Sequence, residues 1–301
     1  MTLHGIIPVW KPKGMTSHDV VSRIRRLAGQ KRVGHTGTLD PEVEGVLPIC
    51  LGQATRLVEY IQNLPKRYQG TMTVGIATDT EDQTGKIVEQ VDDIPKTFPL
   101  DDVAQAFQGE MEQVPPMYSA VKIKGERLYE LARKGLVTER PSRRVTIYQL
   151  DIQQVESDAY PILAFDVTCS KGTYVRTLCV DIGKSLGYPA HMSKLIRVQS
   201  GPFQTADCYT LEELGLAKEE GTFAQTLVAM GEAMCHLPAI VVNQEDGQRV
   251  LDGSIFEWDE TVKVSASNLV RIYDESGRFC AIYEIHHQDL RPVKVFRDVH
   301  E

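Results

Sequence analysis

The sequence predicts an α+β fold, with alternating helices and strands over residues 1–237 and a small all-β domain over residues 238–301. Three observations predict this class. Apolar residues recur at helical spacing after Thr16, polar and apolar residues alternate through 67–78, and the last part of the chain contains several short β-rich runs. The chain has 301 residues, of which 42% are hydrophobic, and this is enough for a sizeable core.

The first predicted element is a helix over residues 16–29, with the sequence TSHDVVSRIRRLAG. Thr16 and Asp19 have the spacing of a capping box, and Gly29 suits the C-terminal cap. The apolar residues that share one face of this helix are Val20, Ile24 and Leu27. A second, short helix is predicted over residues 52–64.

A strand is predicted next, over residues 67–78, because polar and apolar residues alternate along RYQGTMTVGIAT. The apolar face of this strand consists of Tyr68, Met72, Val74 and Ile76. The acid-rich residues 79–102 predict an exposed loop and connector. Another strand is predicted over 162–169, and a helix begins near Thr173. The buried stripe of this helix is formed by Val175, Leu178, Ile182 and Leu186. Arg176 falls in its first turn, outside the stripe.

The segment after Leu237 changes character, because it consists of short β-rich runs separated by polar turns. These runs are AIVVN, SIFEW, TVKVSA, NLVRIY, FCAIYEI and PVKVF. Several short strands at regular spacing predict a small barrel or sandwich. The domain boundary is therefore predicted at Leu237 and Pro238.

The charge of the chain is unevenly distributed. The net charge of −8 by itself disfavours a polyanionic partner. Residues 1–70, 122–148 and 170–197, however, together carry a formal charge of +14, so the rest of the chain carries −22. A basic face on an acidic protein can attract a phosphate backbone. Whether the three basic segments converge in space stays open from the sequence alone.

The cysteine and histidine patterns favour an intracellular protein without a structural metal. Six cysteines occur without a CxxC pair, which predicts buried, reduced thiols. His286 and His287 have no nearby cysteine and make a poor zinc signature. No apolar run is long enough to span a membrane or to serve as a secretory signal. We therefore expect a cytoplasmic monomer with no membrane partner.

The most constrained acid is Asp40, in the loop KRVGHTGTLDPEVEG. Pro41 favours an extended conformation for the residue before it. Gly34, Gly37 and Gly45 permit close approach of a ligand to the main chain. An acid held in this way can be presented rigidly to a substrate, although Asp-Pro also commonly starts a simple turn. The Walker A and GxGxxG patterns are absent, so the loop is not a recognised nucleotide-phosphate cradle.

Three other residues are candidates for a site, each with a structural alternative. Arg176 stands at a helix start, where a cation opposes the helix dipole. It could pair with Asp40 and keep that carboxylate ionised, or it could be a solvated surface side chain. Tyr68 could stack on a base or pack within the sheet. Leu195 is by default a core residue.

Together these motifs resemble those of the bacterial TruB-type tRNA pseudouridine synthases over most of the chain. The similar segments are, in order, WKPKGMTSHDVV, VGHTGTLDPEVEGVLPICLGQATR, KRY, PPMYSAVKIKGERLYELARKG, CSKGTYVRTLCVDIG and AHMSKLIRVQSGPF. Six motifs in this order make the resemblance highly specific. It implies a mixed, mostly antiparallel sheet with flanking helices, followed by an RNA-binding PUA-like β-barrel. Tyr283 departs from the pattern of that barrel, in which a glycine is common.

The resemblance also implies the residues of an active site. Asp40 corresponds to the catalytic aspartate, and Arg176 to the arginine that pairs with it. His35 corresponds to the histidine that helps to displace the target nucleotide from its stack. Lys11 and Pro12 would support the loop structurally.

A pocket for the target base is implied as well. Tyr68 corresponds to the tyrosine that stacks on the base, Tyr174 to a neighbouring pocket tyrosine, and Leu195 to the leucine that lines the uracil pocket. The base must be flipped out of the folded loop to reach such a pocket, which costs a few kcal/mol.

The implied activity is isomerisation of uridine 55 in the T-loop of tRNA to pseudouridine, with the tRNA T-arm as the partner. The reaction involves no redox change or hydrolysis, so it requires no cofactor and no metal. A non-catalytic tRNA-binding or tRNA-folding protein on the same scaffold is the alternative. A hydrolase that used Asp40 would need a second nearby carboxylate, for which Glu42 and Glu44 are close in sequence.

Overall fold

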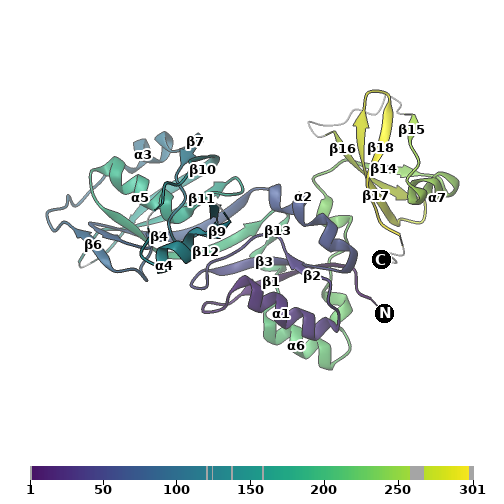
Figure 1. The fold of residues 1–301 in the computed structure, drawn as a ribbon, viewed down its shortest axis with the longest axis horizontal. Coiled ribbons are helices and arrows are strands. Elements are labelled where there is room, and N and C mark those ends of the chain that lie inside the picture. Colours follow the sequence, from purple (N-terminus) through teal and green to yellow (C-terminus); the bar gives the residue numbers. More distant parts are fainter. Residues whose placement is uncertain are drawn as a thin grey trace. The chain divides into compact units, whose positions relative to one another are not determined.

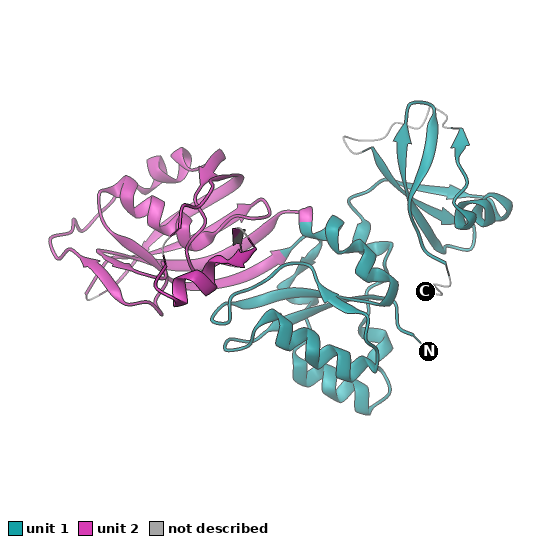
Figure 2. Cartoon of the chain, viewed as in Figure 1, with its two compact units in different colours: residues 1–62, 200–301 teal, residues 63–199 magenta. Residues whose placement is uncertain are grey.

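The computed structural model describes residues 2–119, 121–123, 125–136, 138–157, 159–257 and 268–297. The chain forms two compact units, which are described separately (Figures 1 and 2). Unit 1 comprises residues 1–62 and 200–301, and unit 2 comprises residues 63–199. The predicted α+β class is confirmed, since both units combine helices with antiparallel strand pairs.

The N-terminal sheet of unit 1 is built around its longest strand. This strand is β3 (Glu44–Leu51), which pairs antiparallel with β1 (Gly5–Lys11) and with β2 (Val33–His35). One face of the sheet packs against helices α1 (Ser17–Ala28) and α6 (Leu211–Glu219). β3 is almost fully buried because its residues contribute to hydrophobic clusters on both faces of the sheet.

Helix α1 forms as the capping pattern predicts. Thr16 and Asp19 make both hydrogen bonds of the capping box, and Gly29 ends the helix in the left-handed conformation with φ +64°. The predicted second helix is also present. It consists of a 3₁₀ turn η1 (Gly52–Leu57) followed by α2 (Val58–Asn63).

The C-terminal module of unit 1 is a curled five-stranded sheet. Its strands, in spatial order, are β14 (Ala239–Val242), β16 (Leu269–Asp274), β17 (Phe279–His286), β18 (Asp289–Val295) and β15 (Phe256–Glu257). Helix α7 (Gln244–Asp252) packs on one face. The sequence did not predict this helix, because only Val250 and Leu251 of its residues are large and apolar. The predicted strand TVKVSA lies outside the described residues.

The other face of this sheet shares a hydrophobic core with the N-terminal part of unit 1. Phe279, Ile282 and Phe296 belong to the same buried cluster as Leu57 and Ile61. The segment between the two parts adds short elements to unit 1, namely β13 (Phe203–Gln204), η2 (Thr205–Asp207), η3 (Phe223–Thr226) and η4 (Glu232–Met234).

Unit 2 is organised around one sheet and two hairpins. The strands of the sheet, in spatial order, are β12 (Ala190–Ser200), β4 (Lys66–Val74), β11 (Ile162–Cys169), β10 (Arg143–Val155) and β7 (Gly109–Gln113). The hairpins are β5 (Ile76–Thr78) with β6 (Ile87–Gln90), and β8 (Lys122–Ile123) with β9 (Glu126–Arg127). The helices are α3 (Leu100–Ala106), α4 (Leu128–Arg133) and α5 (Val175–Leu186).

Two predictions for unit 2 are wrong in part. The strand predicted over 67–78 is broken at Gly75, which adopts φ +105°, so Ile76 belongs to a separate strand. The acid-rich residues 79–102 are more than a connector, because they contain β6 and a structured turn that is described below. The strand at 162–169 and the helix after Thr173 are confirmed.

All six cysteines are free thiols, and four of them are buried. The prediction of buried thiols is wrong for Cys235, which is exposed, and Cys208 is half-buried. Within the described part of the chain, no helix is long and apolar enough to cross a membrane.

Candidate active site

The loop around Asp40 is held on both sides of the acid. The main-chain N–H of Leu39 donates to the Ser17 hydroxyl at 2.9 Å, and that hydroxyl in turn donates to the Leu39 carbonyl at 3.3 Å. On the other side, the Pro41 carbonyl accepts a hydrogen bond from the Gly14 N–H at 2.8 Å. Asp40 is half-buried between these anchors. Its main chain is therefore fixed by Gly14, in the segment that joins β1 to α1, and by Ser17, the first residue of α1.

Lys11 is the second anchor of this loop. Its side chain is fully buried at the end of β1, and its ammonium donates to the carbonyls of Pro12, Met15 and Pro41 at 2.9, 2.6 and 3.1 Å. An ammonium has three N–H donors, so these bonds satisfy each of them. The geometry confirms that Lys11 supports the loop.

His35 and the acids near Asp40 complete the unit 1 part of the site. His35 ends β2, opposite Ile49 of β3, and its Nδ1 accepts from the Gly37 N–H at 3.2 Å. Glu42 forms an exposed ion pair with Lys13 at 3.3 Å. Glu42, one of the candidates for a second carboxylate, is thus engaged with a lysine.

The other four predicted site residues lie in unit 2. Tyr68 is half-buried on β4, opposite Val167 of β11. Leu195 is 9% exposed on β12, the strand beside β4. Tyr174 precedes the first residue of α5, and Arg176 is in its first turn.

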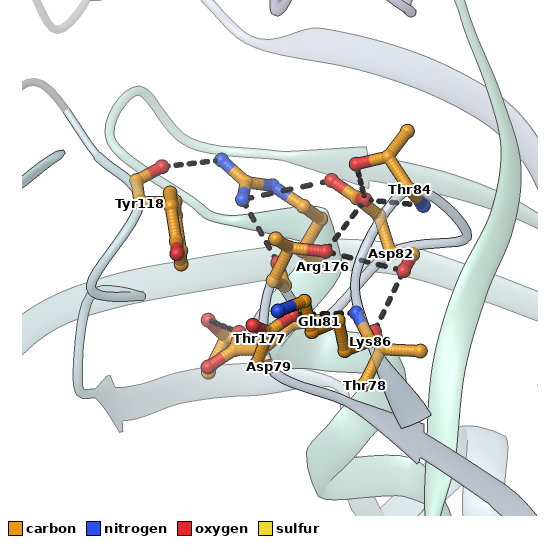
Figure 3. Close-up of polar contacts among 10 residues, drawn as sticks. Thr78, Asp79, Glu81, Asp82, Thr84, Lys86, Tyr118, Arg176 and Thr177 are labelled. Carbon is orange, nitrogen blue, oxygen red and sulfur yellow. Dashed lines mark hydrogen bonds and ion pairs between the residues drawn. The ribbon is translucent and has the colours of Figure 1, made fainter. Parts of the chain in front are cut away.

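Arg176 is buried, with only 5% of its surface exposed. Its guanidinium donates to the main-chain carbonyls of Thr80 at 3.0 Å and Tyr118 at 2.9 Å, and it lies 3.7 Å from the carboxylate of Asp82 (Figure 3). The alternative reading of Arg176 as a solvated surface side chain is therefore wrong. A buried arginine persists where its donors and its charge are matched, as they are here.

The sequence interpretation missed Asp82, which organises the turn between β5 and β6. One of its carboxylate oxygens accepts from the Thr80 hydroxyl at 2.8 Å and from the Thr84 N–H and hydroxyl at 2.9 and 2.6 Å (Figure 3). The residues on either side of Asp82 exchange main-chain hydrogen bonds with Met192 of β12, at 3.1 and 3.0 Å. The pattern TDTEDQT, rich in aspartate and threonine, is typical of such side-chain-stabilised turns and was the available signal.

Burial changes the proton affinity of two groups close to these residues. Glu81, beside Asp82, accepts from the Thr177 hydroxyl at 2.7 Å, and burial raises the pKa of its carboxyl. Lys66, on the same strand as Tyr68, is 5% exposed, and burial together with the charge of Arg197 lowers the pKa of its ammonium to about 8. Among the described residues, no group of three or more His, Cys, Asp or Glu side chains is arranged so that it could hold a metal ion.

The predicted residues thus fall into two sets. Unit 1 contains Asp40, in a braced loop, and His35, at the end of the strand before that loop, while unit 2 contains the three pocket residues and Arg176. The pairing of Asp40 with Arg176 stays a prediction, because the two residues belong to different units.

Two family descriptions match the sequence. "TruB family pseudouridylate synthase (N terminal domain)" matches residues 25–175, and "tRNA pseudouridylate synthase B C-terminal domain" matches residues 176–233.

Curated relatives match almost the whole chain. The tRNA pseudouridine synthase B of Halalkalibacterium halodurans is 46% identical over 293 residues, which cover 95% of this chain and 94% of the relative. That of Geobacillus thermodenitrificans is 46% identical and covers 98% of this chain and 100% of its own. That of Bacillus subtilis is 44% identical and covers 97% of each chain.

Solved structures show a similar architecture. A chain of an H/ACA RNP bound to a substrate RNA containing 2′-deoxyuridine has a TM-score of 0.73 and 26% identity, covering 98% of this chain and 86% of its own. A chain of a Cbf5-Nop10-Gar1 complex has a TM-score of 0.73 and 27% identity, covering 98% and 84%. These similarities confirm the architecture expected from the sequence motifs.

Proposed function

The chain belongs to the TruB family of pseudouridylate synthases, and on this premise we propose that it converts uridine 55 in the T-loop of tRNA to pseudouridine. It is an isomerase that acts on tRNA. The observation that carries this conclusion is the 46% identity to relatives named tRNA pseudouridine synthase B over 95–98% of the chain. Such a match includes the Asp40 loop, the Tyr68 strand and the start of α5.

The reaction requires that one glycosidic bond is exchanged for another within the same nucleotide. The N1–C1′ bond breaks, the uracil turns, and a C5–C1′ bond forms. The proton on C5 then leaves and N1 gains a proton, so that atoms and charge balance. The protein must therefore hold the detached uracil and supply a carboxylate to the sugar.

Asp40 is the residue we assign to the sugar. It could act as a nucleophile at C1′ or as a base at C2′, and both roles require an ionised, positioned carboxylate. The bonds from Ser17, Gly14 and Lys11 to its neighbours support this role, because they fix the main chain on both sides of Asp40. Arg176 would pair with Asp40 and keep it ionised.

The remaining site residues are assigned to the flipped base. Tyr68 would stack on the uracil, with Tyr174 and Leu195 around it, and His35 would help to displace the nucleotide from its stack. The half-buried positions of both tyrosines support these assignments, because neither residue is fully enclosed by the protein.

Electrostatic attraction to the tRNA backbone would supply much of the affinity. Exposed cations of unit 2 include Arg127, Arg133, Lys134, Arg144 and Lys171. The dissociation constant for tRNA should therefore rise steeply with salt, and the protein would recognise the shape of the T-arm and its single-stranded loop. The reaction would take place in the cytoplasm, where reduced thiols persist. We also expect the protein to act as a monomer.

The test is to incubate the purified protein with a T-arm hairpin transcript and with full-length tRNA, and then to map pseudouridine by carbodiimide labelling and primer extension. We expect one modified position, uridine 55, in both RNAs. Asp40→Asn should bind tRNA with unchanged affinity and lose about 10³-fold or more in rate.

Two outcomes would contradict the proposal. Binding of tRNA without any product would favour the non-catalytic tRNA-binding alternative. Modification of tRNA but not of the hairpin would show that recognition extends beyond the T-arm.

A further inference from the structure

We propose that Gln113 and Arg143 position Tyr174 for the reaction. The two residues are partners on neighbouring strands at the edge of the sheet in unit 2. Gln113 ends β7, and Arg143 begins β10 as its antiparallel partner. The inference rests on the proposed function, in which Tyr174 lines the pocket for the target base.

Gln113 binds the main chain of Tyr174 through both ends of its amide. The amide oxygen accepts from the Tyr174 N–H at 2.7 Å, and the amide nitrogen donates to the Tyr174 carbonyl at 3.0 Å. Gln113 is 1% exposed, so both bonds are shielded from water. A buried side chain that satisfies the N–H and the carbonyl of one residue fixes the position and the direction of that residue together.

Arg143 holds the ring of the same tyrosine. Its guanidinium carbon lies 5.3 Å from the centre of the Tyr174 ring, within the range of a cation–π contact. An ammonium and a guanidinium can both make a cation–π contact, but only the planar guanidinium can also stack flat on an aromatic face. The cross-strand pair therefore restrains Tyr174 at two places, its main chain and its ring.

The turn that leads into Tyr174 is anchored on the same strand. Ser170 and Thr146 of β10 exchange two hydrogen bonds, both of 2.8–2.9 Å, and the Thr173 hydroxyl donates to the Ser170 carbonyl at 2.9 Å. The edge of the sheet thus supports the whole approach to α5.

This degree of support is more than the helix itself requires. Tyr174 occupies the N-cap of α5 but makes no side-chain cap bond. In the described structure its hydroxyl has no hydrogen-bond partner, and its ring is half-buried. A half-buried ring that is restrained in this way suits contact with a ligand.

The test measures the single-turnover rate and the dissociation constant of the full chain with a T-arm transcript. Gln113→Met keeps the size of the side chain and removes both hydrogen bonds, and Arg143→Lys keeps the charge and removes the planar stack. We expect each to lower the rate about 10- to 100-fold, with a dissociation constant within about twofold of wild type. In a Tyr174→Ala background, Gln113→Met should lower the rate further by less than about threefold.

Gln154→Met is the matched control. The Gln154 amide also donates to a main-chain carbonyl, that of Lys96 at 2.8 Å. Gln154 lies at the opposite end of β10 from Arg143, paired with Leu163 of β11. Its rate should equal that of wild type. If Gln113→Met fails to fold by circular dichroism, the half-exposed Arg143 still allows Arg143→Lys to decide the question.

Three results would overturn the inference. Wild-type rates for both variants would show that Tyr174 needs neither residue. A raised dissociation constant at an unchanged rate in Arg143→Lys would show that Arg143 contacts the RNA backbone instead. An inactive wild-type protein would overturn the proposed function and this inference with it, whereas an active wild type with unaffected variants overturns the inference alone.

Discussion

Asp82 uses its two carboxylate oxygens for different purposes. One oxygen accepts three hydrogen bonds from Thr80 and Thr84 and so shapes the turn, while the other lies 3.7 Å from the Arg176 guanidinium. Because Arg176 also binds the carbonyls of Thr80 and Tyr118, a single buried cation joins two loops of unit 2.

Replacement of Asp82 by asparagine separates these two purposes. Asp82→Asn keeps an oxygen for the turn but removes the negative charge that faces Arg176. We expect the rate of pseudouridine formation to fall about 10- to 100-fold, because a small displacement of Arg176 would disturb its proposed pairing with Asp40. Single-turnover kinetics with a T-arm transcript measure this. Asp92→Asn, an exposed carboxylate in the same unit, is the control, and equal rates for both variants would contradict the prediction.

Lys66 is a buried cation whose protonation should affect stability. Its ammonium donates to the Leu64 carbonyl at 2.7 Å, and its pKa of about 8 lies below the ordinary value of 10.5. Between these two values the unfolded chain binds a proton that the folded chain has released. The free energy of unfolding should therefore rise with pH over this interval.

The free energy of unfolding of the wild type, relative to that of Lys66→Met, should rise by on the order of 1–3 kcal/mol between pH 8 and pH 10.5. Urea denaturation at a series of pH values measures it. Parallel pH profiles for the two proteins would show that Lys66 keeps its ordinary proton affinity in the fold.

Single residues were predictable from the sequence only where a motif marked them. Asp40 and Tyr68 stand within recognisable motifs. The burial of Arg176 was not predictable, because its partners Thr80 and Asp82 are more than 90 residues earlier in the chain and look like part of a solvated acidic stretch. Only the folded sheet brings that turn against α5.

At the scale of elements, α1 both packs on the sheet and supports the Asp40 loop. Its capping residue Thr16 immediately precedes Ser17, whose hydroxyl binds the main chain of Leu39. The start of α1 therefore fixes the main chain of Leu39, the residue before Asp40.

Thr16→Ala should lower the free energy of unfolding by about 1 kcal/mol, because it removes the hydrogen bond to the Asp19 N–H. Thr210→Ala removes the equivalent bond from α6 and should have a similar effect on stability. Only Thr16→Ala should also lower the rate of pseudouridine formation. Urea denaturation and single-turnover assays of both variants measure this, and equal rates would show that the loop does not depend on the start of α1.

Elements with strong local signals were predicted well, and weakly patterned ones were not. α1 has a capping box, an apolar stripe and a terminal glycine, and these agree with one another. α7 has the sequence QEDGQRVLD, in which two apolar residues are too few to indicate a period, so its helix depends on packing against the C-terminal sheet. The break at Gly75 was missed because the alternation of apolar residues continues across it.

At the scale of the whole molecule, the C-terminal module is joined to the rest of unit 1 by a shared core. Phe296 is fully buried, its ring stacks on Phe279 at 5.1 Å, and the Arg56 guanidinium lies 5.2 Å from its centre. Arg56 also donates to the Val295 carbonyl at 2.5 Å. The predicted boundary at Leu237 therefore crosses one shared hydrophobic cluster, although the C-terminal module also has a cluster of its own.

Phe296→Ala should lower the free energy of unfolding by about 3–5 kcal/mol, because it leaves a cavity in this shared core. We expect a single transition in which both parts of unit 1 lose structure together. Val241→Ala, at an exposed position of the same module, should change stability by less than about 0.5 kcal/mol. Denaturation followed by circular dichroism measures both. A separate early transition of the C-terminal module would contradict the prediction.

The shared core has a consequence for the order in which the chain folds on the ribosome. Unit 2 is one continuous stretch and has all its residues once position 199 has been synthesised. β1, β3 and α2 are made first, yet they must wait for Phe279, Ile282 and Phe296 near the end of the chain before their core can close. Unit 2 can therefore complete its core before unit 1 completes the core that it shares with the C-terminal module.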